Sequence, residues 1–127
     1  MKENIAVEKS YAFALKVVKI NYYLIDKKRE FVLSKQMLRS GTSIGANLEE
    51  AAGAQSRADF IHKVHIALKE TRETDYWIRL IRDSELLSLE EAELLREDCV
   101  EIVKILTKTL KTCKTNDSNK LQITNNK

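Results

Sequence analysis

Almost nothing in this chain interrupts a helix, because its 127 residues include no proline and only three glycines. Proline breaks the interior of a helix and glycine weakens it, whereas the abundant leucine, isoleucine, lysine and glutamate favour it. No stretch shows the strict alternation of apolar and polar residues that marks a half-buried strand. The sequence therefore predicts an all-α protein.

Four segments carry apolar residues at a period near 3.6, which is typical of amphipathic helices. We expect helices over residues 4–27, 34–52, 56–82 and 88–114. Ser56 and Ser88 are the predicted N-caps of the last two, since an acidic residue follows each of them three positions later.

The expected inner faces follow from the same periodicity. For the first helix we expect Tyr11, Leu15, Val18, Tyr22 and Ile25. For the second we expect Leu33, Met37, Gly41, Ile44, Leu48 and Ala51. For the fourth we expect Leu95, Cys99, Ile102, Leu106, Leu110 and Cys113.

The links between these helices, around residues 28–33, 53–55 and 83–87, are short. Short links make successive helices antiparallel neighbours, so the sequence predicts an antiparallel up-down-up-down four-helix bundle over residues 1–114. Residues 115–127 are polar without a sustained pattern, and we expect a disordered C-terminal tail there.

Gly41 and Gly45 lie inside the second predicted helix, where each costs about 1 kcal/mol relative to alanine. Four positions apart, they remove side-chain bulk from one side of the helix. This predicts the close approach of a neighbouring helix, from the same chain or from another subunit. Ser43, Asn47 and Glu50 lie alongside and are expected to form hydrogen bonds at this packing or subunit interface. Tyr76 and Trp77, two large aromatic residues of the third predicted helix, are assigned to the same set of interface residues.

Charge is distributed unevenly along the chain. Residues 1–40 hold nine Lys or Arg against four Asp or Glu, residues 41–103 seven against fourteen, and residues 104–127 six against one. An up-down bundle brings the start of the first helix and the end of the last to one end, which predicts a basic surface there. The lysines expected to bind nucleic-acid phosphates are Lys2, Lys9, Lys16, Lys104, Lys108, Lys111 and Lys114.

No catalytic motif, phosphate-binding glycine loop or cofactor site is visible, so we expect a protein that is not an enzyme. Asp59, His62 and His65 share a helix face, but a structural zinc site needs four ligands, and we expect no metal. A metal-dependent bundle enzyme would instead bind its metal near the two histidines. Cys99 and Cys113 would lie about 21 Å apart on one helix, too far for a disulfide, and are expected to be reduced thiols.

No apolar run approaches the ~20 residues of a membrane span, and no signal peptide is recognisable at the N-terminus. We therefore expect a cytoplasmic protein with no membrane partner.

Two runs of sequence resemble a known family. One is RSGTSIGANLEEA, which contains S-I-x-x-N-x-x-E at Ser43, Ile44, Asn47 and Glu50. The other contains A-L-K-E-x-x-E-T-x-Y-W at Ala67, Leu68, Lys69, Glu70, Glu73, Thr74, Tyr76 and Trp77. Over about residues 5–112 the chain resembles the bacterial four-helix-bundle family of 23S rRNA intervening-sequence proteins, and the accessory protein of diversity-generating retroelements is similar in fold.

The resemblance implies a bundle that assembles into a ring-shaped homopentamer. It also implies an accessory role with RNA or DNA, or with a reverse transcriptase or another protein, and it carries no catalytic residue. Here the acidic middle of the chain confines the basic surface to the ends of the bundle and the first helix. The alternative is a protein-interaction scaffold that does not bind nucleic acid, in which Tyr22, Tyr23, Tyr76 and Trp77 would contact the partner.

Overall fold

The structure, a computed structural model, describes the backbone of residues 4–125 and the side chains of residues 4–116. The described part forms four helices and no strand, which confirms the all-α class. The helices are α1 (Ile5–Asp26), α2 (Leu33–Ala52), α3 (Arg57–Asp83) and α4 (Leu89–Asn125). The first three begin and end within one residue of the predicted bounds, and so does the start of α4.

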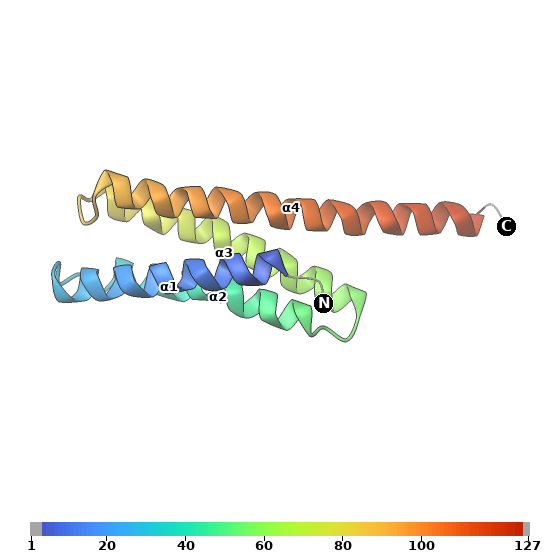
Figure 1. Ribbon diagram of the computed structural model, residues 1–127, viewed down its shortest axis with the longest axis horizontal. Helices are drawn as coiled ribbons and strands as arrows, with labels where there is room; N and C mark the ends of the chain where they lie inside the picture. Colours follow the sequence, from blue (N-terminus) through green and yellow to red (C-terminus); the bar gives the residue numbers. More distant parts are fainter. Residues whose placement is uncertain (1–3, 126–127) are drawn as a thin grey trace.

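α4 continues to Asn125, past the end predicted at Lys114. The segment predicted as a tail therefore begins as helix, because no glycine or proline follows Gly53 to stop it. In Figure 1 the last part of α4 extends beyond the other three helices. Residues 126 and 127 of the predicted tail lie outside the described residues. Neither α4 nor any other described helix is both long and apolar enough to cross a membrane.

The chain reverses its direction at each of three short loops, as Figure 1 shows. α2 packs against both α1 and α3, and α3 also packs against α4, whereas α1 and α4 meet less extensively. The start of α1 and the final turns of α4 consequently lie toward the same end of the molecule.

Two serine side chains cap helices as predicted. Ser56 Oγ accepts a hydrogen bond of 3.0 Å from the Asp59 N–H at the start of α3. Ser88 Oγ accepts one of 3.1 Å from the Glu91 N–H at the start of α4. Each bond satisfies a backbone donor that has no partner within the helix, so both N-cap predictions are confirmed.

The predicted inner faces of α2 and α4 are confirmed over most of their length. The buried members are Met37, Gly41, Ile44, Leu48, Ala51, Leu95, Cys99, Ile102 and Leu106. Leu33, Leu110 and Cys113, at the ends of these stripes, are half-buried. The core therefore lies along the length of both helices, and its side chains become partly exposed toward the C-terminal part of α4.

The predicted inner face of α1 is wrong. Tyr11, Leu15 and Tyr22 are 64%, 49% and 67% exposed, and Val18 and Ile25 are only half-buried. The face that packs inward comprises Ser10, Phe13, Val17, Asn21 and Leu24. Both stripes have helical spacing, but the inner one includes two polar residues. A prediction from hydrophobicity alone therefore placed the inner face on the wrong side of α1.

The two glycines of α2 let α1 approach closely. A Cβ added at Gly41 would lie 2.9 Å from Val17 Cγ1, and one added at Gly45 would lie 3.4 Å from Ser10 Oγ. The first distance is shorter than carbon atoms tolerate, so α1 occupies the space that a larger residue would need. The neighbour that the glycine spacing predicts is thus a helix of the same chain.

The start of α2 has a cap that the sequence did not indicate. The Glu30 carboxylate accepts hydrogen bonds from the N–H groups of Val32, Leu33 and Ser34, at 3.0, 2.9 and 2.8 Å. Burial disfavours ionisation of this carboxyl, but the three backbone donors outweigh it and lower its pKa below the ordinary value of 4.5. Glu30 thereby takes the place of an N-cap side chain, which Val32 cannot provide.

Replacing Glu30 with glutamine is expected to lower the free energy of unfolding by about 1 kcal/mol at neutral pH. A group whose folded-state pKa is lowered stabilises the fold above its unfolded pKa, and this contribution disappears as the pH falls through the folded-state pKa. Urea denaturation near neutral pH and in acid should therefore show a difference that becomes smaller as the pH falls. The exposed Glu49→Gln variant is the control, and equal stability of Glu30→Gln and the unmodified protein at neutral pH would contradict the capping role.

Candidate nucleic-acid interface

The lysines predicted to bind nucleic acid lie on several surfaces. Lys2 is outside the described residues. Lys9 and Lys16 of α1 form ion pairs with α4, with Nζ atoms 2.5 Å from Glu101 Oε1 and 2.8 Å from Asp98 Oδ2. These acidic partners offset both charges, so the two lysines add little to a basic surface.

The remaining four predicted lysines are exposed on α4: Lys104, Lys108, Lys111 and Lys114. Among the side chains that the structure describes, none of the four has an acidic partner within ion-pair distance. Lys111 and Lys114 line a groove between α4 and α3, whereas Lys104 lines a smaller hollow that acidic residues of α4 also line. The structure therefore brings only two of them to a shared concave site.

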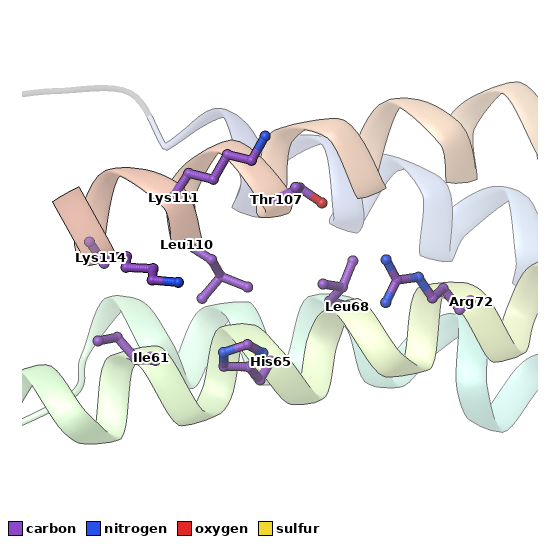
Figure 2. A pocket seen from close by; sticks show the side chains of 9 residues that line it. Ile61, His65, Leu68, Arg72, Thr107, Leu110, Lys111 and Lys114 are labelled. Carbon is purple, nitrogen blue, oxygen red and sulfur yellow. The ribbon is translucent and has the colours of Figure 1, made fainter.

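This basic groove has a volume of about 510 Å³ and is open to solvent. Its lining comprises Ile61, His65, Leu68, Arg72, Thr107, Leu110, Lys111, Cys113 and Lys114. Figure 2 shows Leu68 of α3 pointing toward α4 and Leu110 pointing toward α3, whereas the Lys111 side chain extends away from α3. Of the lining residues that the structure describes, four are basic and none is acidic, so an anion in the groove would meet favourable charge from both helices.

Arg72 and His65, which the sequence did not assign to the nucleic-acid interface, belong to a longer stripe on α3. Its members are His65, Lys69, Arg72, Tyr76 and Arg79, spaced four, three, four and three residues apart. All five are exposed, and the Arg79 guanidinium carbon lies 5.8 Å from the centre of the Tyr76 ring, within cation–π range. The helical spacing of these residues was the signal that could have revealed the stripe.

Toward the other end of α3 and α4 the charges cancel. Asp75 of α3 accepts hydrogen bonds from Arg79, at 3.2 Å, and from Arg96 of α4, at 2.9 Å. Glu93 of α4 pairs with Arg82 at 2.9 Å and with Arg96 at 3.6 Å. The hydrogen bond to Asp75 is the main reason that the pKa of Arg96 is raised. The uncompensated positive charge is consequently confined to the groove end of this face.

The remaining predicted interface residues lie mainly where α2 meets α3. Ser43 Oγ donates to the Arg39 carbonyl at 2.7 Å, and Asn47 Nδ2 donates to the Ser43 carbonyl at 2.8 Å. These bonds stay within α2, whereas Glu50 Oε2 lies 3.0 Å from Lys63 Nζ of α3.

The two aromatic residues of this predicted set have different surroundings. The half-buried Trp77 donates its Nε1–H to Glu73 Oε2 at 3.1 Å, and Glu73 also pairs with Arg39 of α2. Tyr76 packs edge-on against Trp77, with ring centres 5.0 Å apart, but is 47% exposed. Trp77 thus takes part in a contact between helices of one chain, while about half of the Tyr76 surface stays exposed to solvent.

Within the described part of the chain, no three His, Cys, Asp or Glu side chains are placed to hold a metal ion together. His62 and His65 are exposed on α3. Burial raises the pKa of the Cys99 thiol to about 12, which keeps that side chain protonated at neutral pH. The basic groove is therefore the feature with the clearest capacity to bind a ligand.

The family model of the 23S rRNA-intervening sequence protein matches residues 2–108. The chain belongs to this family. Most of the bundle of this intervening-sequence protein falls inside the match, but Lys111 and Lys114 lie beyond it. The family assignment therefore does not by itself explain the α4 side of the groove.

The chain is also similar to a solved structure from Bacteroides thetaiotaomicron, described as a protein of unknown function from the S23 ribosomal protein family. The two are 48% identical with a TM-score of 0.83, over 84% of this chain and 99% of the other. Among curated proteins, none matches this chain. No catalytic family is indicated by these similarities.

Proposed function

We propose that this intervening-sequence protein is a non-enzymatic, oligomeric accessory protein of the cytoplasm that binds nucleic acid through its basic groove. Its protomer is an antiparallel up-down-up-down bundle that presents the groove at one end. The observation that carries the proposal is the groove lining, in which the described residues include His65, Arg72, Lys111 and Lys114 and no acidic side chain.

The binding is electrostatic and largely independent of sequence. The Arg72 guanidinium can donate two parallel hydrogen bonds to one phosphate, whereas Lys111 and Lys114 act as mobile point charges. Phosphate contacts of this kind release counterions, so the affinity falls as salt rises. Lys104 and Lys108, exposed on the same helix, extend the positive field outside the groove.

The proposal is tested by fluorescence polarisation with a labelled RNA of mixed sequence at about 50 mM salt. Arg72→Ala is expected to weaken binding several-fold, because it removes one phosphate contact. Lys35→Ala, which removes an exposed charge from α2, is the matched control and should bind as the unmodified protein does. If no nucleic acid binds at this salt concentration, the proposed function is wrong.

The oligomeric part of the proposal is supported by the outer face of α1, where Tyr11, Leu15 and Tyr22 expose apolar surface in helical register. Such a stripe is typical of a surface that packs against another protein. The family resemblance suggests five copies in a ring. Light scattering is expected to show a mass several times 14.6 kDa, and Leu15→Glu should reduce it. A single-chain mass for the unmodified protein would contradict assembly.

The second candidate function is a protein-interaction scaffold, which the exposed rings of Tyr22, Tyr23 and Tyr76 favour. Aromatic side chains supply much of the energy at protein interfaces. A partner such as a reverse transcriptase would then be retained in a pull-down after nuclease treatment. Loss of every partner on nuclease treatment would favour the nucleic-acid role instead.

A further inference from the structure

We infer that the basic groove binds single-stranded nucleic acid in preference to a duplex, with bases on its aliphatic floor and phosphates on its basic rim. This inference rests on the proposed function, and names the form of nucleic acid that the same site takes. The inference comes from the order of aliphatic and basic residues along the groove. Attraction between charges alone does not account for the aliphatic residues in that order.

Along α3 the lining alternates between aliphatic and basic side chains: Ile61, His65, Leu68 and Arg72, at spacings of four, three and four. Leu110 of α4 also lines the groove, and Figure 2 shows it directed at α3. The groove thus places aliphatic side chains next to the cations Arg72, Lys111 and Lys114. A single strand has the same alternation, because each nucleotide carries one phosphate and one base with an apolar face.

A duplex fits this arrangement poorly. Its bases are paired and stacked inside, so only phosphates and sugars would reach the groove. The cations would be satisfied, but the aliphatic floor would gain no contact. A single strand can turn its bases out and lay them on apolar or aromatic side chains.

The α3 stripe extends the same chemistry past the groove. Tyr76, one turn beyond Arg72, is 47% exposed and has Arg79 beside its ring. An exposed tyrosine next to basic side chains is a stacking platform for a further base. Arg72 and Tyr76 are four residues apart on one helix face, so a strand leaving the groove could place its next base on Tyr76.

An acidic amphipathic protein helix is the competing occupant of such a groove. The continuation of the basic and aromatic stripe favours the nucleic acid, because Tyr76 lies outside the concave part that would hold a helix.

The test compares four probes by fluorescence polarisation. They are an RNA strand of about 12 nucleotides, the same strand annealed to its complement, an abasic strand with equally many phosphates, and poly-L-glutamate. The single strand is expected to bind at least about tenfold more tightly than the duplex and the abasic strand, since one base contact is worth a factor of this order. Poly-L-glutamate is expected to bind more weakly than the single strand.

Ile61→Gln tests the aliphatic floor, because Ile61 lines the groove and is only half-buried. It is expected to weaken single-strand binding several-fold and to leave duplex binding unchanged. Leu94→Gln, on an exposed site of α4 outside the groove, is the matched control and should change neither. Circular dichroism melting of both variants verifies that they fold.

The outcomes distinguish the preference for a single strand from nucleic-acid binding as such. Equal binding of single strand, duplex and abasic strand would overturn the preference and leave the proposed function standing. Binding of no nucleic acid would overturn both, and binding of poly-L-glutamate alone would identify the groove as a site for an acidic protein segment. Unchanged single-strand binding by Ile61→Gln would show that bases do not contact the floor.

Discussion

Gly41→Leu is expected to lower the free energy of unfolding by about 3 kcal/mol, which is at the upper end for overpacking of a well-packed core. Even a single Cβ at this position would lie 2.9 Å from Val17 Cγ1, and leucine adds three further carbons. α1 and α2 must then move apart, which exposes apolar surface on both. Urea denaturation followed by circular dichroism measures the loss.

Two further variants separate this clash from a general effect on α2. Ala46→Leu adds the same side chain at an exposed position of the same helix and should leave the stability nearly unchanged. In a Val17→Ala background, Gly41→Leu should cost less than in the unmodified protein, because the facing methyl groups are gone. An unchanged melting curve for Gly41→Leu alone would show that α1 does not pack against Gly41.

Reversing the charge of three groove residues, Arg72→Glu, Lys111→Glu and Lys114→Glu, is expected to lower nucleic-acid affinity at least about 100-fold. The variant replaces three cations that meet no acid in the groove by three carboxylates that repel phosphate. All three side chains are exposed, so the fold should tolerate the changes. Polarisation titration at low salt measures the affinity.

The control variant reverses three exposed lysines elsewhere, Lys19→Glu, Lys28→Glu and Lys35→Glu. Its net charge equals that of the groove variant, so a general loss of attraction would weaken both alike. We expect the control to lose much less affinity, because its changes lie outside the groove. An equal loss in the two variants would show that net charge, and not the groove, determines binding.

The sequence predicted the helices well because their signals are local. Capping serines, the 3.6-residue period and the absence of helix breakers act within a few residues of one another. Ser56 and Ser88 cap as expected, and the buried faces of α2 and α4 follow their apolar stripes. The predicted inner face of α1 was wrong because the actual inner face includes two buried polar residues, Ser10 and Asn21.

The candidate site could be predicted only in part, because it depends on how two distant segments lie together. Lys111 and Lys114 were visible in a basic segment of the chain. Arg72 lies in the acidic middle of the chain, whose negative net charge gave no sign of a basic site. Its acidic neighbours in the sequence pair with other residues, so they do not neutralise it.

The ion pairs of Lys9 and Lys16 were hidden from the sequence for a related reason. Their partners, Glu101 and Asp98, lie on α4, so the pairs depend on the register between α1 and α4. The distribution of charge along the chain does not reveal that register, so both lysines were predicted to be available for phosphates.

A salt titration of nucleic-acid affinity tests the central claim most directly. Three or four phosphate contacts on a single strand predict that log affinity falls by about 2 to 3 per log unit of salt, at roughly 0.7 per contact. The variant with Arg72, Lys111 and Lys114 reversed should lose most of this slope. Absence of binding at about 50 mM salt, or binding whose affinity does not change with salt, would contradict the account.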